Sequence, residues 1–128
     1  MHFYHYILYT AFIIIFALNT NAEEKYEYIY VNEDNLYPEG IILDNEGNLY
    51  ISSFTKDKIV KINIESKDQS DFIQPGQYGM MSSIGLFVDK QDNTLWACSS
   101  EPGVSEFKGK ESVSLKHFDL KTQKLIKS

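Results

Sequence analysis

A single cysteine and the lack of any basic stripe set the first limits on this sequence. Cys98 has no second cysteine to pair with, so the chain cannot form an internal disulfide. Its stability therefore has to come from packing. The formal net charge is −6 at pH 7, and the lysines are scattered along the chain. Because such a chain offers no row of cations to phosphates, we expect no nucleic-acid partner.

Two short motifs are also missing. The sequence has no Asn-x-Ser/Thr sequon to mark N-glycosylation and no Gly-x-Ser-x-Gly to form a nucleophile elbow. The composition is nevertheless that of a folded protein, because 43% of the 128 residues are hydrophobic. This length gives room for one modest domain.

The N-terminus differs from the rest of the chain. Residues Ile7 to Leu18 are almost wholly apolar, short residues follow at Thr20 and Ala22, and acidic residues begin at Glu23. This pattern predicts a secretory signal peptide over residues 1–22, cleaved after Ala22, and a mature domain over residues 23–128. We therefore expect a secreted or periplasmic protein.

An uncleaved membrane anchor is the alternative for the same leader. Its first residues contain no Lys or Arg, so the usual positive flank of a signal peptide is weak. The wider apolar run is also close to the lower length limit for a spanning helix. With an uncleaved leader, the protein would be membrane-anchored and its domain would still lie outside the cytoplasm.

The stretch from Tyr37 to Phe54 is repeated about 45 residues later. In the first copy, two apolar runs flank the turn-forming residues Asp44 to Asn48, which predicts a β-hairpin. The second copy runs from Gly85 to Ser99 with a turn that is one residue longer. In this alignment Asp44 matches Asp89, and Asn48 matches Asn93. A repeat of this period indicates a repeated supersecondary unit.

Each hairpin is followed by two further predicted strands. The expected strands are 41–43, 49–51, 58–64 and 71–73 in the first unit, and 84–89, 94–99, 112–120 and 125–126 in the second. An additional strand is predicted at Lys25 to Val31, and an exposed loop at Glu101 to Glu111. Because the first strands of each unit are apolar on both faces, we predict an all-β fold, a partial β-propeller of two four-stranded antiparallel blades.

The chain resembles a known family in these same residues. The resemblance rests on Pro38-Glu39-Gly40-Ile41, Gly47-Asn48-Leu49-Tyr50, Ser52-Ser53-Phe54, Leu95-Trp96-Ala97-Cys98-Ser99 and Phe118-Asp119-Leu120-Lys121-Thr122. These look like the opening blades of the senescence marker protein/gluconolactonase family of six-bladed propellers, with NHL-repeat propellers as close relatives. The motifs are specific for the fold and say little about the activity.

The resemblance implies six blades, whereas this chain carries two. Two blades cover one face each and leave two apolar faces open, which repeat architectures generally avoid. We expect a truncated or split gene product. The alternative is self-association through the open blade faces, in which three chains of two blades would close one ring.

Glu39 is the candidate metal ligand. It precedes the first strand of the first unit, and its counterpart in the second unit is Ile84, so the repeat itself does not require an acid there. The resemblance implies a divalent cation, usually calcium, bound by a Glu at this place. Calcium takes about six to eight oxygen ligands, and the family's other ligands belong to later blades. The structural alternative is a solvated turn glutamate.

Two other groups of residues have simpler interpretations. Asp44, Glu46 and Asn48 alternate as oxygen donors, but a hairpin turn explains all three. Cys98 and His117 could form a thiolate–imidazole pair, although a small buried thiol is the ordinary occupant of an apolar strand.

The functional expectation follows from the resemblance. The resemblance implies an extracytoplasmic propeller fragment related to metal-dependent lactone hydrolases. We expect this fragment to be inactive alone. The alternatives are a non-catalytic NHL-like propeller module that binds a protein or small-molecule partner, and the remnant of a longer gene.

Overall fold

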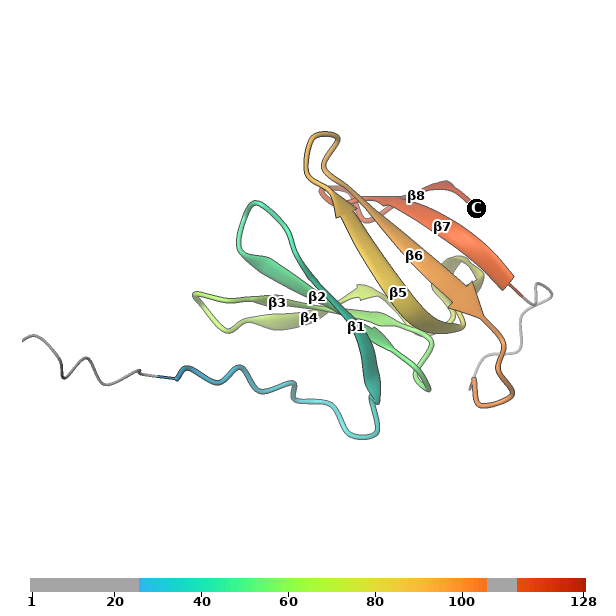
Figure 1. Ribbon diagram of the computed structural model, residues 1–128, viewed down its shortest axis with the longest axis horizontal. Coiled ribbons are helices and arrows are strands. Elements are labelled where there is room, and N and C mark those ends of the chain that lie inside the picture. Colours follow the sequence, from blue (N-terminus) through green and yellow to red (C-terminus); the bar gives the residue numbers. More distant parts are fainter. Residues whose placement is uncertain (1–25, 106–112) are drawn as a thin grey trace, which may run out of the picture.

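The computed structural model describes residues 26–105 and 113–128, and in these ranges the protein is all-β (Figure 1). The strands are β1 (Pro38–Leu43), β2 (Asn48–Ser53), β3 (Ile59–Asn63), β4 (Gln69–Ile73), β5 (Ser82–Asp89), β6 (Thr94–Ser100), β7 (Val113–Asp119) and β8 (Leu125–Lys127). A three-residue 3-10 turn, Gln77–Gly79, lies between β4 and β5.

The strands form two four-stranded antiparallel sheets in the orders β1-β2-β3-β4 and β5-β6-β7-β8. This arrangement confirms both predicted hairpins and is consistent with propeller blades. The expected signal peptide at residues 1–22, with its anchor alternative, lies outside the described residues, as does most of the Glu101–Glu111 loop. None of the helical segments among the described residues is long and apolar enough to span a bilayer.

The two sheets repeat each other down to an irregularity in the first strand pair. Pairing is interrupted between Pro38–Ser53 and Ile41–Ile51 in one sheet, and between Ser83–Ser99 and Leu86–Ala97 in the other. These registers place Gly40 and Gly85 at equivalent positions inside the bulge. The period-45 repeat of the sequence is therefore a repeat of backbone geometry.

The registers correct one detail of the sequence alignment. Asn93 corresponds to Gly47 and not to Asn48, since both have positive φ, 55° and 76° respectively. The backbone oxygens of Gly47 and Asn93 also accept equivalent bonds, from the amides of Ile64 and Leu120. Asn tolerates the left-handed region better than most residues, which explains why it can replace glycine there.

The prediction of a strand at Lys25 to Val31 is wrong for the described residues 26–31, which have no strand assignment. The alternation itself is present, because the tyrosines are exposed while Ile29 and Val31 pack against the first sheet. Backbone pairing fails because this segment crosses the face of the sheet instead of joining an edge. We call residues 26–36 the N-terminal segment (Figure 1).

The main core lies between the two sheets. It contains Tyr50, Ile59, Phe72 and Ile73 from the first sheet and Val88, Leu95, Ala97 and Phe118 from the second. Phe72 is at its centre and makes edge-to-face contacts with Tyr50 and Phe118, at centroid distances of 5.0 and 6.1 Å. The strands β1 and β5 lie side by side (Figure 1).

A smaller core lies on the other face of the first sheet. Leu36 of the N-terminal segment covers Ile51, Val60 and Ile62 there, with Ile29 and Val31 packed at the margin. The segment is also anchored by Glu33, whose carboxylate lies 2.7 Å from the Lys58 ammonium. Lys58 in turn lies 2.9 Å from Asp71.

We predict that Gly40→Ala destabilises the protein, while Gly85→Ala does not. A Cβ on Gly40 would lie 2.6 Å from the backbone oxygen of Ile84 and 2.8 Å from Ser52 Oγ. The same atom on Gly85 would meet only Cys98, at 3.6 Å. Urea unfolding should show a loss of about 1–3 kcal/mol for Gly40→Ala. Gly85→Ala, the matched control at the equivalent bulge, should stay within about 0.5 kcal/mol. Equal losses would contradict the tight contact between the sheets.

Candidate functional site

Glu39 lies near the start of β1 with its side chain exposed. It borders an apolar hollow of about 260 Å³ whose other lining residues are Val31, Pro38, Gly40, Ile41 and Ile51. Among the described residues, no group of three or more His, Cys, Asp or Glu side chains could hold a metal ion. One exposed carboxylate beside an apolar surface does not meet the needs of calcium. The described residues therefore do not fit a calcium site by themselves.

Asp44 organises the first hairpin turn. Its Oδ1 accepts hydrogen bonds from the backbone amides of Glu46 and Asn48, both at 2.8 Å. Its Oδ2 accepts from Asn48 Nδ2 at 2.9 Å and from the Tyr50 hydroxyl at 3.0 Å. All four bonds serve the hairpin, which confirms the turn interpretation of Asp44 and Asn48. Glu46 is exposed at the tip.

These bonds also determine the ionisation of the turn. Burial of the Asp44 carboxyl acts to raise its pKa, but the hydrogen bonds from Asn48, Glu46 and Tyr50 outweigh burial and bring the pKa below its ordinary value. The pKa of Tyr50 is raised by its burial and by the negative charge of Asp44. Asp44 is therefore an anion, and Tyr50 a neutral donor, at neutral pH.

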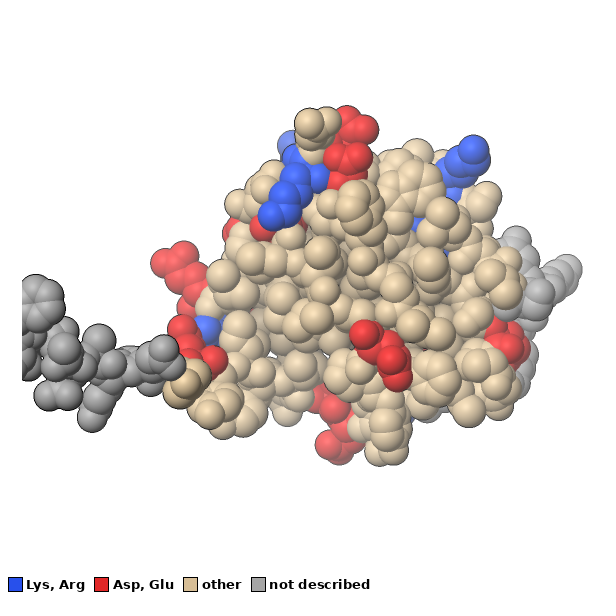
Figure 2. Space-filling model, in the orientation of Figure 1, with Lys and Arg blue, Asp and Glu red and all other residues tan. Residues whose placement is uncertain are grey.

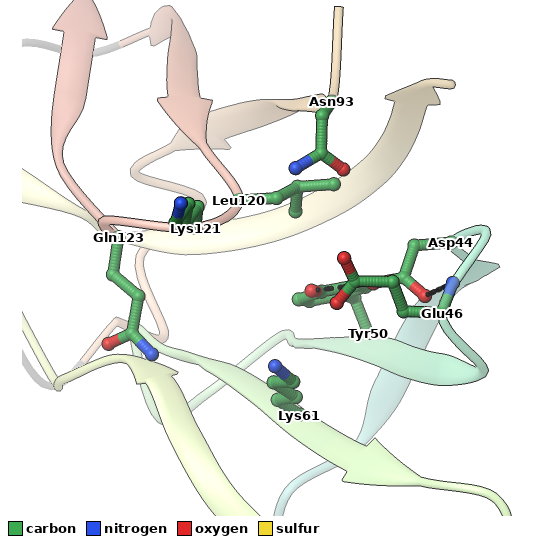
Figure 3. Close-up of a pocket in the computed structure, with 8 residues that line it drawn as sticks. All are labelled: Asp44, Glu46, Tyr50, Lys61, Asn93, Leu120, Lys121 and Gln123. Atoms are coloured by element: carbon green, nitrogen blue, oxygen red, sulfur yellow. Dashed lines mark hydrogen bonds between the residues drawn. The ribbon is translucent and has the colours of Figure 1, made fainter. Parts of the chain in front are cut away.

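A polar hollow of about 340 Å³ lies where the turns of the two sheets meet (Figure 3). It is lined by Asp44, Glu46, Tyr50, Lys61, Asn93, Leu120, Lys121 and Gln123. Because the Asp44 oxygens are already bonded, the polar side chains left for a ligand are those of Glu46, Lys61, Asn93, Lys121 and Gln123. The sequence gives no sign of this hollow, since its lysines stand far apart in the chain and only the stacking of the sheets unites them.

Cys98 and His117 do not form a catalytic pair. No hydrogen bond joins them, and the His117 ring instead stacks on Trp96 at 3.8 Å with an interplanar angle of 8°. Cys98 is paired across the strands with Leu115. It is exposed, so the expectation of a buried thiol is wrong. The reason is that no further sheet of the described residues covers this face of β5–β8.

The sequence does not predict a buried series of hydrogen bonds that joins Asp57, Ser105 and Ser82. Asp57 is fully buried, and its carboxylate accepts a hydrogen bond from the Ser105 hydroxyl. Ser105 Oγ accepts from the Ser82 amide at 2.9 Å. Ser82 belongs to β5, whereas Asp57 and Ser105 belong to two separate connections. These hydrogen bonds therefore tie the 101–105 loop to both sheets. The large separation of the three residues in sequence leaves no local signal.

Within residues 26–105 and 113–128, one face of the second sheet is apolar and uncovered. Cross-strand pairs place on this face Phe87, Trp96, Cys98, Val113, Leu115 and His117, which we call the outer face of β5–β8. Phe87, Val113 and Leu115 are 60%, 75% and 52% exposed. By contrast, charged side chains are scattered over the side of the molecule shown in Figure 2, without a basic stripe.

In the first sheet, the face equivalent to the outer face of β5–β8 is covered. By register, Ile42, Tyr50 and Ser52 correspond to Phe87, Trp96 and Cys98. In the first sheet these positions face the second sheet, and Tyr50 is only 1% exposed. The outer face of β5–β8 is thus the equivalent of a sheet-contact face, and among the described residues no further sheet covers it, as expected for two sheets that share one contact. The other predicted open face is partly covered by the N-terminal segment, which the sequence did not predict.

Comparison with known proteins shows no family for this chain. No protein-family model matches the chain, and no curated protein matches it. Its structure is similar to a chain of the solved structure "Crystal Structure of Mitotic Checkpoint Complex", with 8% sequence identity and a TM-score of 0.48. The match covers 85% of this chain and 33% of the other, so this chain spans about a third of its length. A similarity at this level carries no conclusion about function.

We predict that Asp44→Asn destabilises the protein at pH 7 and weakens its acid sensitivity. Because the folded pKa lies below the unfolded value, Asp44 stabilises the fold above about pH 4, and this contribution is lost as the pH falls through the folded pKa. The asparagine amide would also face the donors of Asn48 and Tyr50, so the loss at pH 7 should be about 1–3 kcal/mol.

Urea unfolding of the wild type and the variant between pH 7 and pH 2 measures both effects. The exposed Asp92→Asn removes the same charge from the turn of the other hairpin and should leave stability and pH dependence nearly unchanged. A pH profile of Asp44→Asn that parallels the wild type would show that Asp44 is not an acid-labile support of the turn.

Proposed function

We propose that this chain is a two-blade module of an extracytoplasmic β-propeller, related to the senescence marker protein/gluconolactonase propellers. In this proposal it works by binding: the outer face of β5–β8 docks onto another sheet, and the assembled propeller carries the ligand site. The sequence resemblance and the two repeated sheets support the assignment. No catalytic role is assigned to the chain alone.

One observation supports this function above all. The same register positions are buried in the first sheet and open in the second, so the open face has the chemistry of a surface built for contact. Apolar patches of this kind on soluble proteins usually mark an interaction site. The face is apolar at Phe87, Trp96 and Leu115, and apolar side chains cost little free energy to remove from water.

A metal-dependent lactone hydrolase is the second candidate function, in which Glu39 would be one ligand of a divalent cation, in particular calcium. The observation in its favour is that Glu39 is exposed and has no acidic counterpart in the repeat. The remaining ligands would have to come from outside the described residues.

We predict that Leu115→Lys removes binding of a hydrophobic dye. An open apolar face should bind 8-anilinonaphthalene-1-sulfonate in the native state, and a lysine at the centre of the face should lower the bound fluorescence severalfold. The melting temperature should change little, because Leu115 is 52% exposed. Val104→Lys, in an exposed loop away from this face, serves as the control. Equal fluorescence in Leu115→Lys and the wild type would contradict a docking role for the face.

Calcium titration separates the two candidate functions. Calorimetry of residues 23–128 should give no saturable heat at millimolar calcium, and Glu39→Gln should behave like the wild type, because one exposed carboxylate binds calcium poorly. Saturable heat that Glu39→Gln abolishes would favour the metal-dependent function.

A further inference from the structure

The outer face of β5–β8 has a matching surface within the same chain. The second sheet covers the first through Leu86, Val88, Leu95, Ala97 and Phe118, of which Leu86 is partly buried and the others are buried. By register, the corresponding residues of the first sheet are Ile41, Leu43, Leu49, Ile51 and Ile62. All five are aliphatic, and they form the outer face of β1–β4. The outer face of β1–β4 therefore has the same apolar character as the face of the second sheet that covers the first.

The two outer faces of one chain cannot meet, because they lie on opposite sides of the pair of sheets (Figure 1). They can meet between two copies. Within the chain, the second sheet packs on the first. If the first sheet of another copy packs on the second sheet in the same way, its outer face of β1–β4 lies against the outer face of β5–β8. Such a contact is head-to-tail, since it joins two different surfaces.

The N-terminal segment controls access to one of these faces. Ile41 and Leu43 are 65% and 38% exposed, whereas Ile51 and Ile62 are already covered by this segment. A stacked sheet would need that space. The segment has no strand pairing. It is held by the packing of Leu36, by the Glu33–Lys58 and Glu27–Lys67 ion pairs, and by the Asn32–Gln69 hydrogen bond at 2.9 Å. The Ser53 and Thr55 hydroxyls also donate to the backbone oxygens of Leu36 and Asn35, at 2.7 and 2.6 Å. The segment can therefore be displaced without breaking a sheet.

We propose that a second copy of this chain packs the outer face of its β1–β4 sheet onto the outer face of β5–β8, and that the N-terminal segment must move aside for this contact to form. This inference rests on the proposed docking function and names the partner of the same face.

The internal contact predicts which residues meet. Within the chain, a Cβ on Gly40 would lie 2.6 Å from the Ile84 oxygen and 2.8 Å from Ser52 Oγ. Gly40, Ser52 and Ile84 correspond to Gly85, Cys98 and Glu39. The backbone at Glu39 of the second copy should therefore lie beside Cys98 of the first. A cysteine at position 39 would be close enough for a disulfide between copies.

The test mixes two proteins that carry one cysteine each. Residues 23–128 of the wild type contain only Cys98, and the double variant Glu39→Cys, Cys98→Ser contains only the cysteine at position 39. After mild oxidation of the mixture, non-reducing gels and peptide mass spectrometry should show a mixed dimer joined between positions 39 and 98. Glu65→Cys, Cys98→Ser is the matched control, because Glu65 is exposed in the β3–β4 turn, and its mixed-dimer yield should be at least tenfold lower.

A second variant tests the role of the N-terminal segment. Glu33→Lys places two like charges at the Lys58 anchor while Lys58 keeps Asp71, so the segment should loosen and the yield of mixed dimer should rise severalfold. Glu65→Lys makes the same charge change away from the segment and should leave the yield unchanged. Circular dichroism of each variant checks that it is folded.

Two results would overturn the inference. A mixed-dimer yield no higher than that of the Glu65→Cys control would show that no second copy stacks head-to-tail. A Cys98–Cys98 dimer of the wild type at equal yield would show that like faces meet instead. If dye binding to the outer face nevertheless depends on Leu115, the docking function stands with a different partner. An unchanged yield in Glu33→Lys would remove the segment from the mechanism.

Discussion

The face-to-face packing of the two sheets is the contact on which the rest of the structure depends. Phe72 of the first sheet contacts both Tyr50 and Phe118, so one aromatic ring links the two sheets. The backbones can approach because Gly40 has no side chain where Ile84 and Ser52 come close. With each fully buried large apolar side chain contributing about 1.5–3 kcal/mol, a small sheet gains its stability mainly from this contact. Among the described residues, neither sheet has a core of this size on its other face.

That dependence explains the state of the two outer faces. The first sheet is partly covered by Leu36 and its neighbours in the N-terminal segment, which shield Ile51, Val60 and Ile62. The second sheet has no such cover among the described residues, and Phe87, Val113 and Leu115 remain largely exposed. The asymmetry gives the chain one ready docking face and one shielded face. Function is then expected at the level of the assembled sheets.

The strands were predictable because their signals are local. The apolar runs, the turn at Asp44 and the repeat itself are all contained within short stretches, and the observed strands fall where these stretches predict them. The open outer face could also be foreseen, since two blades cannot cover four faces. The exposure of Cys98 follows from the same argument. The local sequence predicts a buried thiol instead, because an apolar strand is usually covered on both faces.

What sequence reasoning missed depends on contacts between distant segments. The Asp57–Ser105 hydrogen bond spans 48 positions. The polar hollow unites Lys61 with Lys121 only through stacking of the sheets. The alternation in residues 26–31 was correctly identified, but periodicity alone cannot distinguish a paired strand from an extended segment that crosses a sheet. The role of Glu39 depends on residues outside those described and stays a prediction.

Native-state hydrogen exchange measures the central claim most directly, because it reports how far each sheet depends on the other. If the shared core holds the protein together, the central strands β2 and β3 and the central strands β6 and β7 should exchange through the same global opening, with equal opening free energies and equal denaturant dependence. Exchange of one sheet at a much lower free energy than the other would contradict the account, because it would show two independent units.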